Sequence, residues 1–148
     1  MNIKLILVAL YMLNWKAIGI GAIINAFLTI LLVLAFFPFF FLGPLIGGFL
    51  TAYLNNGYEN YDKIDEKDGI VGGALSGIIG GIIIGLLFLL GFGAISAIIG
   101  LIFIKIGIIA STITLIVGLV ITVLSIFLGA VLGAIGGFIG VVVKQNEY

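Results

Sequence analysis

The side chains that could do chemistry are few and scattered. The chain of 148 residues has no His and no Cys, and its six basic residues are all lysine. The usual general base, thiol chemistry, disulfides and most metal sites are therefore missing. The bidentate clamp that arginine provides for phosphate or carboxylate is also missing. Serine and threonine hydroxyls remain, but none has the neighbouring base that a nucleophile needs. We expect no enzymatic activity, no cofactor and no metal.

Acidic side chains gather in one polar stretch, Asn55–Asp68. Clustered carboxylates can hold a cation, but their spacing here lacks the alternating acids and the glycine of an EF-hand. The stretch is predicted to be a solvated loop, with a specific cation site as the alternative. Asp68 stands where it could cap the helix that follows, and an acid is favourable there.

Two polar residues stand alone in apolar sequence. Asn25 lies in the first apolar block, where an amide commonly hydrogen-bonds to a neighbouring helix. Lys105 is the only charge between Asp68 and Lys144. A charge inside a membrane would indicate function, but Lys105 falls between two apolar blocks and is predicted to reach the membrane surface. No acid lies inside any block, so ion-coupled transport is not expected.

Composition places the whole chain in a membrane. Hydrophobic residues make up 64% of it and charged residues 8%, whereas soluble domains carry roughly 25% charged residues. The net charge is zero, so no strong field would attract nucleic acid. We expect one membrane domain, 1–148, divided as follows: an N-terminal interfacial segment 1–16, apolar block one 17–54, the acidic loop 55–68, apolar block two 69–104 and apolar block three 106–143.

Block one contains its own break. Phe36-Phe37-Pro38 and Gly43-Pro44 bracket an aromatic cluster, and proline suits the first turn of a new helix. We predict a first span at 17–37 and a shorter second one at 44–57. Each of the three blocks is longer than the roughly 20 residues that one upright span needs.

Blocks two and three have weaker break signals. Gly91-Phe92-Gly93 predicts a break after a span at 69–90, with a short remainder at 94–104. In block three, Phe127-Leu128-Gly129 is the best candidate for a break, and one long tilted or curved helix is the alternative. The predicted fold is an all-α polytopic bundle with at least four spans, or six short spans arranged as three hairpins.

Block two carries a glycine at every fourth position. In a water-soluble helix each glycine costs about 1 kcal/mol relative to alanine. In a bilayer, a row of glycines becomes a groove where another helix can lie very close. We therefore predict glycine-zipper packing through Gly69, Gly73, Gly77, Gly81 and Gly85.

Block three carries small or hydroxyl residues in steps of three or four, close to the helical period of 3.6. They form one continuous face, predicted to pack on the glycine groove of block two or to line a seam between subunits. A water-filled lining is the third possibility. The residues are Ser111, Thr114, Gly118, Thr122, Ser125, Gly129, Gly133, Gly136 and Gly140.

Lysines and aromatic residues predict the topology. Both termini and the acidic loop are expected on the cytoplasmic side of the cell membrane. If each block crosses the membrane an even number of times, Lys105 lies on the cytoplasmic side as well. If blocks two and three together cross it only twice, Lys105 is the only lysine on the outer side. Trp15, Tyr53, Tyr58 and Tyr61 fall at the predicted interfaces.

Three motifs suggest a family. They are Asn14-Trp15-Lys16-Ala17, the run Gly43-Pro44-Leu45-Ile46-Gly47-Gly48-Phe49, and Asp68-Gly69 with the glycines after it. Over residues 14–90 the chain resembles a small archaeal family of glycine-rich membrane proteins of unknown function. Ala52 departs from that pattern, because glycine is common there. The resemblance implies an archaeal cytoplasmic membrane and no particular activity.

These observations favour a non-catalytic integral membrane protein. It would self-associate or serve as a small subunit of a membrane assembly through glycine-mediated helix packing. The alternative is a channel or passive transporter for a small solute. The expected partners are the lipid bilayer and further copies or other membrane subunits, and no nucleic acid.

Overall fold

The computed structural model describes residues 14–35, 37–55 and 66–146. Of the interfacial segment expected at 1–16, residues 1–13 lie outside these residues, whereas Trp15 and Lys16 already belong to the first described helix. Most of the acidic loop, with Tyr58 and Tyr61, lies outside them too.

The described residues form helices in the order α2 (Trp15–Ala35), the 3₁₀ helix η1 (Phe37–Phe41), α3 (Leu42–Leu54), α4 (Glu66–Ile102) and α5 (Ile104–Gln145). The all-α prediction is confirmed for them. Helices α2, α4 and α5 are long and apolar enough to cross a membrane, and the apolar helix Phe39–Leu54 is shorter. This composition is consistent with a membrane protein.

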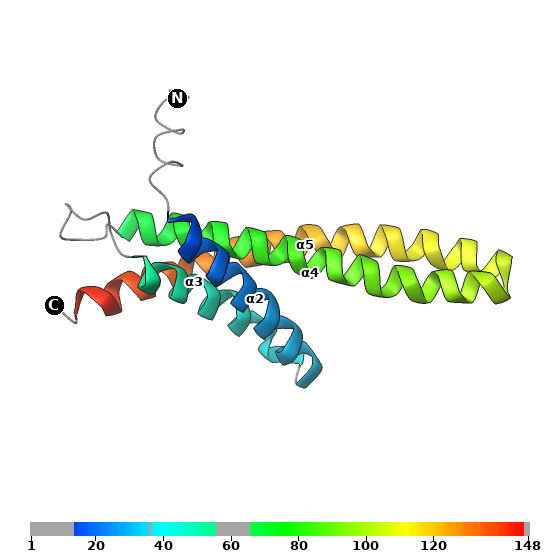
Figure 1. The fold of residues 1–148 in the computed structure, drawn as a ribbon, viewed down its shortest axis with the longest axis horizontal. Helices are drawn as coiled ribbons and strands as arrows, with labels where there is room; N and C mark the ends of the chain where they lie inside the picture. Colours follow the sequence, from blue (N-terminus) through cyan, green and yellow to red (C-terminus); the bar gives the residue numbers. More distant parts are fainter. Residues whose placement is uncertain (1–13, 36, 56–65, 147–148) are drawn as a thin grey trace, which may run out of the picture.

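The longest feature is the antiparallel hairpin of α4 and α5 (Figure 1). Helices α2 and α3 lie across one half of this hairpin and splay away from it toward η1 (Figure 1). We call α2, α3 and residues 66–85 and 122–145 the four-helix part. Residues 86–121, which no further helix covers in the described chain, are the distal hairpin.

Local sequence accounts for the start of α2 and for the reversal after it. The side-chain oxygen of Asn14 accepts a hydrogen bond of 3.2 Å from the backbone N–H of Ala17, which caps α2. The chain reverses through η1, and Pro44 falls in the first turn of α3, where its missing N–H is not needed. The predicted spans of block one are therefore close to the helices, differing by a few residues at each end.

The break predicted at Gly91-Phe92-Gly93 is wrong, because α4 runs through it without interruption. Helix α5 likewise runs through 127–129, so the long-helix alternative holds and the six-span arrangement does not. No described glycine has a positive φ, and a bilayer offers no water to compete for the backbone hydrogen bonds. Glycine therefore need not end these helices. Asp68 lies inside the first turn of α4, which begins at Glu66, and is not its cap.

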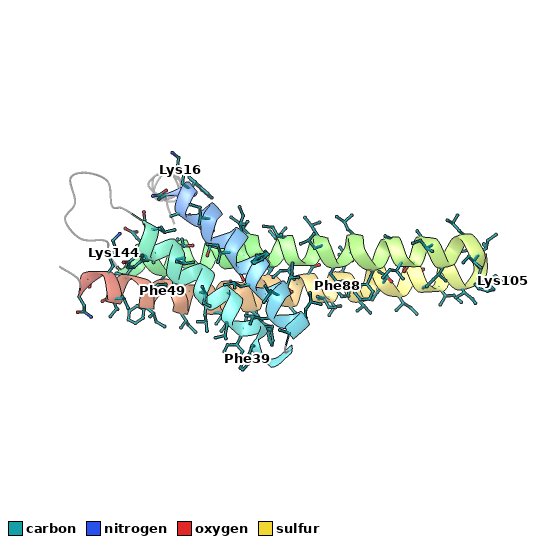
Figure 2. The ribbon with its side chains drawn as sticks, turned by 60° about the horizontal axis from the view of Figure 1, so that its bottom comes forward. Lys16, Phe39, Phe49, Phe88, Lys105 and Lys144 are labelled. Atoms are coloured by element: carbon teal, nitrogen blue, oxygen red, sulfur yellow. The ribbon has the colours of Figure 1, made fainter. Side chains whose placement is uncertain are left out.

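The tip of the hairpin is very tight, because Phe103 alone separates α4 from α5. Its N–H donates to Ile99 and its carbonyl accepts from Gly107, both at 2.8 Å. Gly100 and Gly107 lie backbone to backbone just inside this turn, where a methyl group added at Gly100 would be 3.5 Å from the Cα of Gly107. Lys105 is exposed at the tip (Figure 2).

The distribution of side-chain size is the reverse of that in a soluble protein. The buried apolar residues are mostly alanines, and the largest are Ile18 and Val141. Large apolar residues face outward along every long helix, as Leu34 at 82% and Leu101 at 86% exposed show. In water such surfaces would aggregate, whereas in lipid they meet acyl chains.

Candidate helix-packing site

Helices α4 and α5 approach each other very closely along a row of glycines. A methyl group added at Gly73 would collide with the carbonyl oxygen of Gly133, and one at Gly77 with that of Gly129. At Gly81 it would lie 2.6 Å from the carbonyl oxygen of Ser125. The two helices therefore meet backbone to backbone, and no residue larger than glycine fits without a shift of one helix.

This glycine contact ends at Gly85. A methyl group there would lie 2.7 Å from the Cβ of Thr122, so a side chain now fills the seam. Further along, the position of a methyl group at Gly118 is 3.1 Å from the Cγ of Leu89. From Gly85 to Leu89, side chains separate the two helices, and bare backbone contact returns only at the tip, between Gly100 and Gly107.

The small-residue face of α5 serves two partners, not one. Gly129 faces α4, but a methyl group at Gly136 would lie 2.9 Å from the backbone nitrogen of Phe49 in α3. At Gly140 it would lie 3.0 Å from the Cβ of Ala52, also in α3. The prediction of a single partner for this face therefore needs correction, because the face turns from α4 to α3 toward its end.

Gly133 lies at the point where α3, α4 and α5 meet. A methyl group at Gly48 of α3 would be 2.8 Å from the Cα of Gly133. On its other side, Gly133 contacts the backbone of Gly73, and its own added methyl group would be 3.2 Å from the Cα of Gly77. Only a residue without a side chain can occupy this position between two backbones.

Sequence reasoning missed a second set of packing glycines on α2, α3 and α4. A methyl group at Gly47 would lie 2.6 Å from the carbonyl oxygen of Gly21, so α2 and α3 also touch through backbone. Gly80 lies against the side chain of Asn25, whose Cγ would be 2.8 Å from an added methyl group. The spacing of four residues between Gly43 and Gly47, on either side of Pro44, could have indicated a packing face on α3. Gly137 of α5 lies against the backbone of Gly69 in α4, and it was also absent from the predicted packing residues.

Buried polar side chains occupy the centre of the four-helix part: Asn25, Thr29, Thr51 and Ser76. The hydroxyl of Thr29 donates to the side-chain oxygen of Asn25 at 3.1 Å. Thr51 and Ser76 each donate at 2.9 Å to a carbonyl of their own helix. Within the described chain, the side-chain nitrogen of Asn25 has no acceptor. The hydroxyl donors are thus used locally, as is usual for Ser and Thr in helices.

The hydroxyls predicted to form a stripe on α5 do not form a continuous lining. Ser111 is exposed and donates to its own helix at 3.0 Å. Thr114 pairs with Ser96 of α4 at 3.0 Å, across the seam of the distal hairpin. Thr122 donates to its own helix at 2.7 Å, and Ser125 presents its backbone to Gly81.

Lys144 ties the end of α5 to the end of α3. Its ammonium donates to the carbonyls of Tyr53 and Asn55, both at 2.9 Å, and these carbonyls lie at the C-terminal end of α3. A cation is favourable there because it offsets the helix dipole. Lys16 and Lys144 lie at one end of the molecule and Lys105 at the opposite tip (Figure 2).

A metal site is not evident in the described part. No group of His, Cys, Asp and Glu there could hold a metal ion. The acidic residues before Glu66 lie outside that part.

Comparison with known proteins assigns almost the whole chain to one family. A family model described as a family of unknown function (DUF5518) matches residues 15–143. No curated protein and no solved structure matches the chain.

Proposed function

The chain belongs to DUF5518, a family of unknown function, and we propose that it is a non-catalytic integral membrane protein that self-associates or serves as a small subunit of a membrane assembly. The observation that carries the proposal is the reversed distribution of residue size. Glycine and alanine fill the inside, and Leu, Ile and Phe cover the outside. A chain built this way offers surface to lipid and to other helices, not to a soluble substrate.

Glycine-zipper packing is the proposed means of assembly. Within the chain, the glycines of α4 and α5 bring two backbones into contact, and those of α2 and α3 do the same. Lipid removes the hydrophobic drive between helices, so van der Waals packing, which close backbone contact improves, helps to hold them together. The same chemistry would serve contacts with further copies or with other membrane subunits.

The ends of the molecule suggest its orientation. Lys67 lies in the first turn of α4 and Lys144 in the last turn of α5. Lys16 lies at the same end of the molecule and Lys105 at the opposite tip (Figure 2). By the positive-inside rule, the lysine-rich end would face the cytoplasm. This supports the arrangement in which α4 and α5 each cross once, in a cell membrane that the resemblance suggests is archaeal.

The mass of the native complex in mild detergent tests self-association. We expect a defined multiple of the chain mass, or a fixed complex with other subunits. A monodisperse monomer under conditions that preserve the fold would contradict the proposal.

A pair of variants tests the role of the glycines. Gly77→Ile should lower stability in detergent, because its side chain would meet the carbonyl of Gly129. Gly93→Ile is the matched control, since nothing lies within 4 Å of its added methyl group. If the two variants are equally stable, the packing role proposed for Gly77 is wrong.

A further inference from the structure

The described helices form two hairpins of unequal length. Helices α2 and α3, joined through η1, make the short hairpin, and α4 and α5 make the long hairpin. Helix α2 has 21 residues, or about 31 Å at 1.5 Å per residue, which matches a bilayer core of about 30 Å. Helix α4 has 37 residues, or about 55 Å. An upright position in one bilayer therefore suits the short hairpin but not the long one.

Both hairpins start from the end of the molecule that carries Lys16 and Lys144 (Figure 2), and each has a turn that needs the opposite membrane surface. At η1 the chain leaves α2, and the last carbonyls of a helix have no partner within it. Such backbone groups are not left against lipid in the core. At the tip of the long hairpin, Lys105 is exposed, and a lysine is costly at the bilayer centre. Both turns therefore belong at the same face of the membrane.

The short hairpin diverges from the long one as it leaves the shared end. Asn25 of α2 lies against Gly80 of α4, but Leu31 and Leu34, further along α2, are 47% and 82% exposed. Figure 1 shows α2 and α3 splaying away from the long hairpin toward η1. Two hairpins of unequal length that start together can both end at one flat surface only if they diverge and the longer one is more inclined. The splay in the structure has this form.

The distal hairpin presents the surface of a segment that lies in the bilayer core. Its outward side chains are mostly large and apolar, and Leu90 and Ile98 are each more than half exposed. The exposed hydroxyls of Ser111 and Thr112 both donate to the carbonyl of Ile108, at 3.0 and 2.9 Å, so these donors are satisfied without water. A surface of this kind would aggregate if it stood in water beyond the membrane.

We propose that the long hairpin crosses the membrane obliquely, with acyl chains around the distal hairpin and with Lys105 among the headgroups of the face opposite Lys16 and Lys144. Helix α2 lies closer to the membrane normal. A bilayer with its headgroups is about 40–45 Å thick, so a helix of about 55 Å is inclined by about 40° or more. Neighbouring helices and interfacial anchors set such a tilt, and here they are the short hairpin and the lysines. The inference rests on the membrane integration proposed above and not on self-association.

Thiol labelling tests the inclination, because the chain has no native cysteine. Ile98 lies about 45 Å along α4 from Asp68, so it would stand outside the headgroups of an upright hairpin but within the core if the hairpin is oblique. The purified chain is placed in vesicles of phosphatidylcholine and phosphatidylglycerol, with a charged maleimide on both sides. Ile98→Cys should react at least tenfold more slowly than Phe103→Cys at the tip. Equal rates would overturn the proposal.

Quenching by lipid identifies what surrounds the distal hairpin. A bimane label on Ile98→Cys should be quenched by lipids with brominated acyl chains at least threefold more than the same label on Phe103→Cys. If Ile98→Cys is protected from the maleimide but its label is not quenched, a protein surface covers it, and the proposal is wrong.

The role of Lys105 as the anchor of the tip has its own test. Lys105→Leu should slow the maleimide reaction of Phe103→Cys at least threefold, because the tip can then sink into the core. Lys105→Arg should restore the rate, since it keeps the charge. An unchanged rate with leucine at this position would contradict the placement of Lys105 among the headgroups.

Extraction with alkaline carbonate separates this inference from the general proposal. If the chain leaves the membrane, membrane integration fails and the inclination fails with it. If the chain stays while Ile98→Cys reacts as fast as Phe103→Cys, only the inclination fails. A monomer that shows the expected labelling and quenching supports the inclination and contradicts self-association alone.

Discussion

The four-helix part and the distal hairpin use the same two helices but solve packing differently. In the four-helix part, glycine lies against glycine, and buried positions recur along α4 from Gly69 to Gly85. In the distal hairpin, Ser96 is the only further buried residue of α4. Its seam is held by the Ser96–Thr114 hydrogen bond, the contact of Leu89 with Gly118, and the Gly100–Gly107 pair.

The difference shows what a third and fourth helix add. Where α2 and α3 cover the hairpin, small residues are needed on several sides of α4 and α5, because backbones approach from several directions. Where no other described helix covers it, most of the exposed positions are Leu, Ile, Val and Phe, and Gly91 and Gly93 have no neighbour within 4 Å. In the described chain, a buried glycine therefore marks a side of a helix on which another helix lies close.

The largest effect is expected from Gly133→Ile. The new side chain would meet the backbone of Gly73 and Gly77 in α4, and the backbone of Gly133 already lies close to Gly48 of α3. Overpacking costs about 1–3 kcal/mol, occasionally more, and we expect the upper end because both neighbours are backbone. Unfolding in detergent, followed by circular dichroism, would measure it.

The control for that change is Gly93→Ile in the distal hairpin, where the side chain would enter open space. It should shift the midpoint little. If the two variants unfold alike, the contrast between the two regions does not reflect packing.

A smaller effect is expected from Lys144→Met. It removes two hydrogen bonds from the end of α3, and hydrogen bonds to charged groups contribute about 1.5–3 kcal/mol each when well formed. Partial exposure of Lys144 reduces this, and we expect about 1–2 kcal/mol in total. Lys105→Met at the exposed tip should change stability little, and a comparable loss there would argue against the tie between α3 and α5.

Gly93→Ala should have the opposite sign. Alanine is favoured over glycine by about 1 kcal/mol in a water-soluble helix and by less where lipid protects the backbone hydrogen bonds, and nothing lies near the added methyl group. The variant should therefore unfold at a higher temperature. The same change at Gly77 should destabilise, because the methyl group meets the carbonyl of Gly129. A stabilised Gly77→Ala would contradict the close backbone contact.

The smallest effect is expected from Ser96→Ala. It removes one hydrogen bond between α4 and α5, and such bonds in membrane proteins average about 0.6 kcal/mol. A double-mutant cycle with Thr114→Val would isolate this coupling. A coupling above about 2 kcal/mol would mean that the distal seam depends on polar contact far more than its packing indicates.

The sequence predicted the helix content and the chain reversal between α2 and α3 well. It predicted poorly that α4 and α5 are each one unbroken helix. Proline at positions 38 and 44 leaves few alternatives to a break, because its ring and missing N–H are intrinsic to the residue. Gly91 and Gly93 do not have that property, since a glycine in lipid keeps its backbone hydrogen bonds. Whether Gly91 and Gly93 end a helix depends on the surroundings of the helix, and the local sequence alone does not show these.

The packing partners were only partly predictable. Helical spacing groups Gly129, Gly133, Gly136 and Gly140 on one side of α5, and the structure places them there. Which of them meets α3 and which meets α4 depends on the path of the chain through η1. That path has no signature in the spacing of α5, and so the glycines of α3 that complete the contact were missed.

The one-residue turn at Phe103 has a consequence for how the protein enters a bilayer. A hairpin with so short a link can insert as one unit, with its tip leading and no hydrophilic loop to carry across. Lys105 is the only charge that would have to cross, since no other lies between Asp68 and Lys144. On insertion scales a lysine at the centre of a helix costs about 2.5–3.5 kcal/mol, and the apolar residues on either side of it far outweigh that cost. Within the length that the bilayer core can hold, each apolar turn of the hairpin would favour such insertion.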